Sequence, residues 1–180
     1  MGHYYPKLNA ANAYIWRIVH RNNLPWILEN GLHCRNSPTL SPDYVNIGNE
    51  ELIDKRSRRV VDLPPGGTLS DYVSFYFTPF SPMMYNIHTG RSVPKRRNEE
   101  IIILVSTLHK VKESGRPYLF TDRHAYPPYA IYYNDIEHLT DKKIQAKPRR
   151  STAIRSLSGG GTGLSISSPR CLTWHCMLYR

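Results

Sequence analysis

Acidic residues stop well before the end of this chain, and that break constrains the fold more than any other feature. All 14 Asp and Glu residues of the 180 lie at or before Asp141. Residues 148–180 hold five arginines, six serines and four glycines, with no sustained hydrophobic period of 2 or 3.6 residues. The sequence therefore predicts a folded domain over residues 1–147 and an irregular, disordered Ser/Gly/Arg-rich tail over 148–180.

Short strand-like and helix-like segments alternate along residues 1–147. Stretches rich in β-branched and aromatic residues predict strands over 13–20, 73–77, 100–106 and 117–121. Helices are predicted over 24–30, 48–57, 81–90, 106–115 and 134–143, with Asn23 capping the first and Gly90 ending the third. The apolar run IIILV predicts a buried strand. Because no regular strand–helix–strand repeat appears, we expect a compact α+β domain rather than a doubly wound one.

Several classes of site and segment lack their sequence signatures. The histidines and cysteines show no CxxC or HxxxH spacing, so we expect no metal site and no disulfide framework. There is no glycine-rich phosphate loop and no GxSxG nucleophile motif. No apolar run approaches 18 residues, and the N-terminus lacks a basic-then-apolar leader. We therefore expect a soluble, cytoplasmic protein without a membrane segment.

The charge and the aromatic content point to an anionic partner. The formal net charge is +10, and the chain contains 13 tyrosines. Arginine and lysine neutralise phosphates, while exposed aromatic rings stack on unpaired bases. Tyrosines in irregular or Pro-containing segments are Tyr4, Tyr5, Tyr126, Tyr129, Tyr132 and Tyr133. Packing inside the domain is the alternative role for these rings, so composition indicates a nucleic-acid or other anionic partner and no particular reaction.

Three stretches together resemble the DarT family of bacterial toxins. They are YIWRIVHRNNLPWILENGLH, the run from YVNIGNEELIDKRSRRVV to PPGGTLSDYVSFYFTPFSPMMYNIHTG, and YLFTDRHAY followed by YYND. The resemblance covers about residues 12–147 and implies an ADP-ribosyltransferase fold, with a split β-sheet core and an NAD cleft between the sheets. It also implies transfer of ADP-ribose from NAD onto thymidine bases of single-stranded DNA, and a DarG-like macrodomain antitoxin as partner.

The resemblance assigns roles to five residues. Arg56 matches the catalytic arginine, which would hold the pyrophosphate of NAD or stabilise charge as nicotinamide leaves. His20 falls where this fold places a polar residue against the NAD ribose or amide, and Tyr76 falls where an aromatic ring stacks on nicotinamide. His124 matches a position near the DNA base, with Arg123 beside it as a phosphate contact. A strand-end histidine and a core tyrosine are the structural alternatives for His20 and Tyr76.

The resemblance fails at the catalytic glutamate. That carboxylate stabilises an oxocarbenium-like ribose and follows an arginine-rich run in the family, whereas no acid follows Asp141 here. Codon degeneracy from Ala153 onward permits KRRRHRAEYLISKV in a shifted frame, with the glutamate spanning Leu164 and Ser165. We therefore predict a frameshift near Lys147–Pro148 that makes the tail non-native and the chain impaired or inactive. The alternative is that the tail is a native, basic segment of a divergent member of the family.

Two other functions fit the same residues. A catalytically silent module could bind single-stranded nucleic acid through its basic, aromatic surface. A transferase of the same fold could instead modify RNA or protein. Transfer of label from NAD to thymidine-containing single strands separates the first function from both alternatives.

Overall fold

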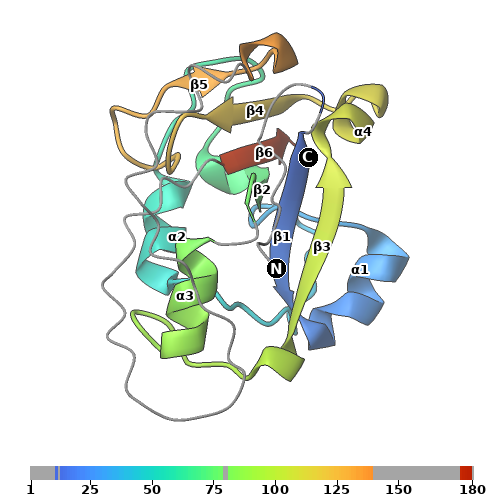
Figure 1. The fold of residues 1–180 in the computed structure, drawn as a ribbon, viewed down its shortest axis with the longest axis vertical. Helices are drawn as coiled ribbons and strands as arrows, with labels where there is room; N and C mark the ends of the chain where they lie inside the picture. The colour runs from blue at the N-terminus through green and yellow to red at the C-terminus, as the bar shows by residue number, and fades with distance from the viewer. Residues whose placement is uncertain (1–10, 12, 79–80, 140–174, 180) are drawn as a thin grey trace, which may run out of the picture.

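The computed structural model describes residues 11, 13–78, 81–139 and 175–179 (Figure 1). The strands are β1 (Tyr14–His20), β2 (Tyr72–Tyr76), β3 (Ile101–Thr107), β4 (Tyr118–Thr121), β5 (Tyr132–Tyr133) and β6 (His175–Tyr179). The helices are α1 (Leu24–Asn30), α2 (Glu50–Ser57), α3 (Pro82–Thr89) and α4 (Leu108–Glu113). Four predicted strands and four predicted helices appear within two residues of their expected bounds. In the view of Figure 1, α2 and α3 lie to the left of β1, and α1 lies to its right.

The sheet consists of two ladders that meet at one point. Its strand order is β3-β1-β2-β6-β4-β5, and each pairing is antiparallel. β1 pairs with β3 along its whole length, from Tyr14 opposite Thr107 to His20 opposite Ile101. In contrast, β1 and β2 share one register pair, Trp16 opposite Tyr76. The ladders β3–β1 and β2–β6–β4–β5 therefore form the split arrangement that we expect from the sequence.

The strand β3 lies at the edge of the sheet, so the prediction of a buried strand is wrong. Most of its residues are half-buried, and Val105 is 57 % exposed. The apolar run correctly predicts a β-strand, because such residues suit a pleated surface. Its place in the sheet depends instead on long-range pairing with β1, which the local sequence does not encode.

A strand occupies part of the predicted irregular tail. β6 pairs with β2 from Tyr72 opposite Tyr179, and with β4 from Tyr118 opposite Leu178. The structure therefore places a strand at residues 175–179, and this strand lies between β2 and β4 in the sheet. The division of the chain into a domain over 1–147 and a tail over 148–180 stays a prediction. The strand is missed because five residues in a Ser/Gly/Arg-rich context carry a weak local signal, whereas two neighbouring strands supply their hydrogen bonds. Residues 148–174 and 180 lie outside the described residues.

The described part of the predicted last helix, residues 134–139, is not an α-helix. The described part of 134–143 contains one 3-10 turn, Ile136–His138, in which the Asp135 side chain accepts from the Glu137 N–H. Residues 140–143 lie outside the described part. No described helix has the length and apolar character needed to cross a membrane.

Two buried clusters fix β1 from both sides. The larger one joins β1, β2, β4 and α4, and contains Ala13, Ile15, Cys34, Val73, Phe75, Phe77, Leu108, Val111, Phe120, Ile136 and Leu139. The other contains Ile18, Ile47, Ile87 and Val93, with Tyr76, Met83, Met84 and Ile101 packed against it. Burial of each large apolar side chain contributes about 1.5–3 kcal/mol. The strand that carries Arg17 and His20 is therefore held in place by packing on both faces.

Asn23 anchors a loop instead of capping α1 as predicted. Its side chain makes no cap hydrogen bond with the helix. The Oδ1 atom accepts from the Val45 N–H at 2.8 Å, and Nδ2 donates to the Val45 carbonyl at 2.9 Å. This two-way bond fixes the loop that places Tyr44 and Asn46 at the cavity described below.

Candidate active site

The helix α2 carries Arg56 in its last turn. Asn49 caps the helix by accepting a backbone N–H through its side chain, and Glu50 and Glu51 lie in the first turn. Lys55 and Arg56 lie in the last turn, where positive charge interacts favourably with the helix dipole. The local sequence therefore favours a helix that ends at a basic cluster, and Arg56 belongs to this cluster.

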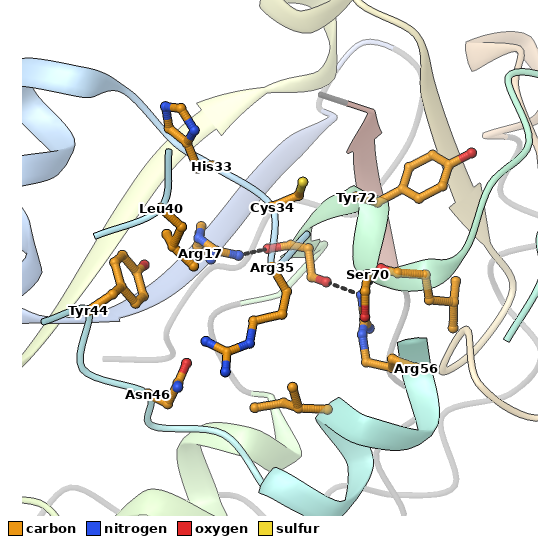
Figure 2. A pocket seen from close by; sticks show the side chains of 13 residues that line it. Arg17, His33, Cys34, Arg35, Leu40, Tyr44, Asn46, Arg56, Ser70 and Tyr72 are labelled. Atoms are coloured by element: carbon orange, nitrogen blue, oxygen red, sulfur yellow. Dashed lines mark hydrogen bonds between the residues drawn. The ribbon is translucent and has the colours of Figure 1, made fainter. Parts of the chain in front are cut away.

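Two guanidinium groups converge on Ser74 in β2. Arg56 Nη2 donates to the Ser74 Oγ at 2.7 Å and to the Leu69 carbonyl at 2.9 Å. Arg17 Nη1, from β1, donates to the Ser74 carbonyl at 2.8 Å. Figure 2 shows both arginines at the cavity, with dashed lines for hydrogen bonds between the residues drawn. Both arginines are thus fixed beside the junction of β1 and β2, where the two ladders meet.

A cavity of about 140 Å³ lies at this junction. It is lined by Arg17, His33, Cys34, Arg35, Leu40, Tyr44, Asn46, Ile53, Arg56, Leu69, Ser70, Tyr72 and Ser74. Figure 2 shows Arg17, Arg35 and Arg56 around the same hollow. The lining includes three arginines and no described Asp or Glu, so the cavity is strongly cationic.

Arg56 also influences two other predicted site residues. Burial lowers the pKa of the Arg56 guanidinium, and the charge of Arg17 lowers it further, against the opposing effect of Tyr76. Burial raises the pKa of Tyr76 to about 12, although both arginines act in the other direction. Burial lowers the pKa of His124 to about 4, and the charge of Arg56 adds to that effect. The structure therefore places Tyr76 and His124 each within electrostatic reach of Arg56.

The His124 ring is neutral at physiological pH because of that low pKa. Its Nδ1 accepts from the Tyr126 N–H at 3.2 Å. A neutral ring whose Nδ1 accepts must carry its hydrogen on Nε2. His124 can therefore offer a hydrogen-bond donor without adding positive charge beside Arg56.

His20 lies apart from the cavity. It ends β1, is 5 % exposed, and is not among the residues that line the hollow. Its Nδ1 accepts from the Asn22 N–H at 3.2 Å, and its Nε2 lies 3.6 Å from Glu100 Oε1. These contacts fix the ring and direct its Nε2 toward a carboxylate.

Arg123 forms a surface ion pair. Its Nη2 lies 2.6 Å from Asp122 Oδ2, which raises the pKa of the guanidinium. Its guanidinium carbon lies 5.2 Å from the centre of the Tyr129 ring, and Tyr129 is 66 % exposed. An exposed ring backed by a cation can stack on a base, so this pair suits a nucleic-acid contact beside His124.

The structure adds two site residues that the sequence reasoning missed. These are Arg17 and Ser74. Arg17 donates to the Ser74 carbonyl, and the Ser74 hydroxyl accepts from Arg56. A signal for Arg17 was available, because it is the one charged residue within the otherwise apolar and aromatic run YIWRIVH. Ser74 gave no signal, since a serine in a strand has no distinctive local pattern.

Metal ligands do not gather anywhere in the described ranges. No group of three or more His, Cys, Asp or Glu side chains in these ranges is placed to hold a metal ion.

Comparison with known sequences identifies close relatives. The family model "ssDNA thymidine ADP-ribosyltransferase, DarT" matches residues 16–154. A DNA ADP-ribosyl transferase of Escherichia coli O127:H6 is 56 % identical over 137 residues, which cover 76 % of this chain and 63 % of that protein. One from Thermus aquaticus is 40 % identical over 134 residues, covering 73 % of this chain and 59 % of that protein. The chain therefore spans about three fifths of the length of these relatives.

Solved structures share the fold. Thermus sp. 2.9 DarT in complex with ADP-ribosylated ssDNA matches with a TM-score of 0.78 and 29 % identity, over 98 % of this chain and 79 % of that one. The same protein in complex with NAD+ matches with a TM-score of 0.67 and 30 % identity, over 98 % of this chain and 78 % of that one. These matches confirm the predicted α+β ADP-ribosyltransferase fold.

Proposed function

The chain belongs to the DarT family, and we propose that its fold serves to transfer ADP-ribose from NAD onto thymidine bases of single-stranded DNA. The observation that carries this proposal is the placement of Arg56, held by Leu69 and Ser74 in a cationic cavity without a carboxylate. Two structures of one relative support the substrates: Thermus sp. 2.9 DarT occurs in complex with NAD+ and with ADP-ribosylated ssDNA.

The proposed chemistry divides among five side chains. Arg56 binds the pyrophosphate of NAD and balances its negative charge while nicotinamide leaves. Tyr76, whose hydroxyl stays protonated at physiological pH, offers a ring face to nicotinamide. His124 donates from Nε2 to the target base, and Arg123 contacts the DNA backbone with Tyr129 against its guanidinium. His20 stays a candidate for the ribose or amide of NAD, oriented by Asn22 and Glu100.

The bond exchange needs a carboxylate that this chain does not supply after Asp141. The bond between ribose and nicotinamide breaks, and nicotinamide leaves as a neutral molecule with the bonding electron pair while positive charge develops on the ribose. A ring nitrogen of thymine then forms the new bond and loses its proton to the carboxylate. We propose that the shifted frame, with its AEYL run, encodes the missing glutamate, and that the chain as written does not complete the transfer.

We further propose a macrodomain antitoxin of the DarG type as protein partner and the cytoplasm as the compartment. Both follow from family membership, because an enzyme that modifies DNA bases acts where DNA is found and its activity must be reversed in the producing cell.

The test is a transfer assay on two proteins, the chain as written and the frame-restored chain. Each is incubated with NAD labelled in its ADP-ribose part and with thymidine-containing single strands, matched strands without thymidine, RNA and a protein mixture. Label on the thymidine strands from the frame-restored chain supports the proposal, whereas label on RNA or protein with DNA untouched would refute it.

The exposed Tyr129 over Arg123 favours one second candidate, a module that binds single-stranded nucleic acid without reaction. Salt-dependent binding of single strands by the frame-restored chain, with no transfer to any acceptor, would favour that module.

A further inference from the structure

Arg17 and Arg56, two of the three arginines that line the cavity, differ from Arg58 and Arg123 in how their charges are balanced. Arg58 pairs with Asp54 at 2.7 Å and Arg123 with Asp122 at 2.6 Å, and both are solvent-accessible. Arg17 and Arg56 form no ion pair within the described residues, although both are only partly exposed. Two like charges therefore lie close together in a site that excludes much of the solvent.

Most of the donors on these two guanidinium groups have no acceptor among the residues that the structure describes. A guanidinium carries five N–H donors. Hydrogen bonds to the described residues use one donor of Arg17 and two of Arg56. The Nε atom of Arg17 is buried and has no partner among the described residues. A buried donor without an acceptor is costly, so the arrangement indicates that a ligand supplies the acceptors.

Ser74 sets the spacing of the two groups. Its carbonyl accepts from Arg17 and its hydroxyl accepts from Arg56, so the two guanidinium groups approach one residue from different elements, β1 and α2. Each fork can then face the cavity of about 140 Å³ with its remaining N–H donors. Two planar forks beside each other match two adjacent phosphoryl groups, since each binds phosphate oxygens in a bidentate manner.

We propose that Arg17 is a second diphosphate ligand, which together with Arg56 holds a pyrophosphate group in the cavity at the junction of β1 and β2. The identity of that group as the diphosphate of NAD rests on the proposed function, whereas diphosphate binding itself does not. Arg17 binds and orients the ligand, and takes no part in breaking a bond.

The experiment uses the full chain as written and inorganic pyrophosphate as the probe, with calorimetry as the measurement. Arg17→Gln and Arg56→Gln are each expected to weaken pyrophosphate binding at least tenfold. Arg58→Gln is the matched control, because Arg58 belongs to the same basic cluster but pairs with Asp54 away from the cavity. That variant is expected to stay within twofold of the unchanged chain. Arg17→Lys is expected to recover only part of the affinity, since an ammonium lacks the planar fork.

A second measurement needs no variant and so does not depend on whether Arg17→Gln folds. An arginine-selective dicarbonyl reagent is applied to the chain, and the modified sites are read by mass spectrometry. Pyrophosphate is expected to protect Arg17 and Arg56 from the reagent and to leave Arg58 equally reactive. Absence of pyrophosphate binding, full binding by a folded Arg17→Gln chain, or lack of protection at Arg17 would each overturn the inference.

Different results would refute diphosphate binding by Arg17 and the proposed transfer function. Arginine-dependent pyrophosphate binding, without transfer by the frame-restored chain, supports the inference and refutes the proposed function. Transfer by that chain at an undiminished rate and KM for NAD after Arg17→Gln refutes the inference alone.

Discussion

Ser74→Ala removes the side-chain acceptor that holds Arg56. The Ser74 Oγ accepts from Arg56 Nη2 at 2.7 Å, and the Leu69 carbonyl is the other acceptor of the same nitrogen. Alanine keeps the Ser74 carbonyl, so the bond from Arg17 Nη1 is retained. The substitution therefore tests one hydrogen bond to a charged group in a partly buried place.

The expected cost follows from the type of bond. A hydrogen bond to a charged group contributes about 1.5–3 kcal/mol to the free energy of unfolding. In a chain of this size, a loss of 1 kcal/mol lowers the melting temperature by about 2–4 °C. We therefore expect Ser74→Ala to lower the melting temperature by roughly 3–12 °C. Ser74→Thr keeps the hydroxyl and is expected to lose much less.

Thermal unfolding followed by circular dichroism measures the change in melting temperature, and urea unfolding measures the change in the free energy of unfolding. Ser70→Ala is the matched control. Ser70 is buried and lines the same cavity, but its side chain forms no hydrogen bond with the described residues. In an Arg56→Met background, Ser74→Ala is expected to cost at least about 1 kcal/mol less than in the unchanged chain. Equal losses for Ser74→Ala and Ser70→Ala, with no coupling to Arg56, would refute this reasoning.

Three further predictions concern the site chemistry. Arg56→Ala in the frame-restored chain is expected to lower the transfer rate by about 10²–10³-fold with an unchanged circular dichroism spectrum; a rate near that of the parent would contradict its role. The pKa of His124 is lowered to about 4 in the folded chain, from about 6.5 in the unfolded chain. Between these two pH values the unfolded chain therefore binds more protons than the folded chain. The free energy of unfolding should thus decrease by up to about 3 kcal/mol as the pH falls from about 6.5 to about 4. His124→Gln should flatten that part of the urea-unfolding profile, and identical profiles would contradict the shift. Restoring the frame near codon 148 is expected to restore transfer and toxicity together, whereas transfer by the chain as written, unchanged by removal of residues 150–180, would contradict the frameshift.

Local elements were predictable because their signals are local. The helix α2 follows from a capping asparagine with acids at its start and bases at its end, and α3 ends at Gly90, whose φ of 77° suits glycine. The split of the sheet and the position of Arg56 came instead from the family resemblance, since no local pattern encodes either.

Features set by distant contacts were not predictable from one sequence. The edge position of β3 depends on which strands pair, and Asn23 bonds to Val45, 22 residues away, in place of its own helix. The cavity likewise combines Arg17, Ser74 and Arg56 from three elements. Arg17 was detectable as a charged residue within a predicted strand. Its role in the cavity could not be predicted, because the sequence does not show that Arg56 lies beside it.

The place of β6 in the sheet bears on the frame hypothesis. Both β2 and β4 present backbone donors and acceptors toward the position that β6 occupies, and an unpaired strand edge there would invite association. A strand fills that position through its backbone, so sequences from either frame can satisfy the same hydrogen bonds. The carboxylate is different, because it depends on side-chain identity and no acid follows Asp141 in the frame as written. The shifted frame offers a strand-like run and a glutamate together, so it is the frame from which we expect a complete sheet and a working transferase.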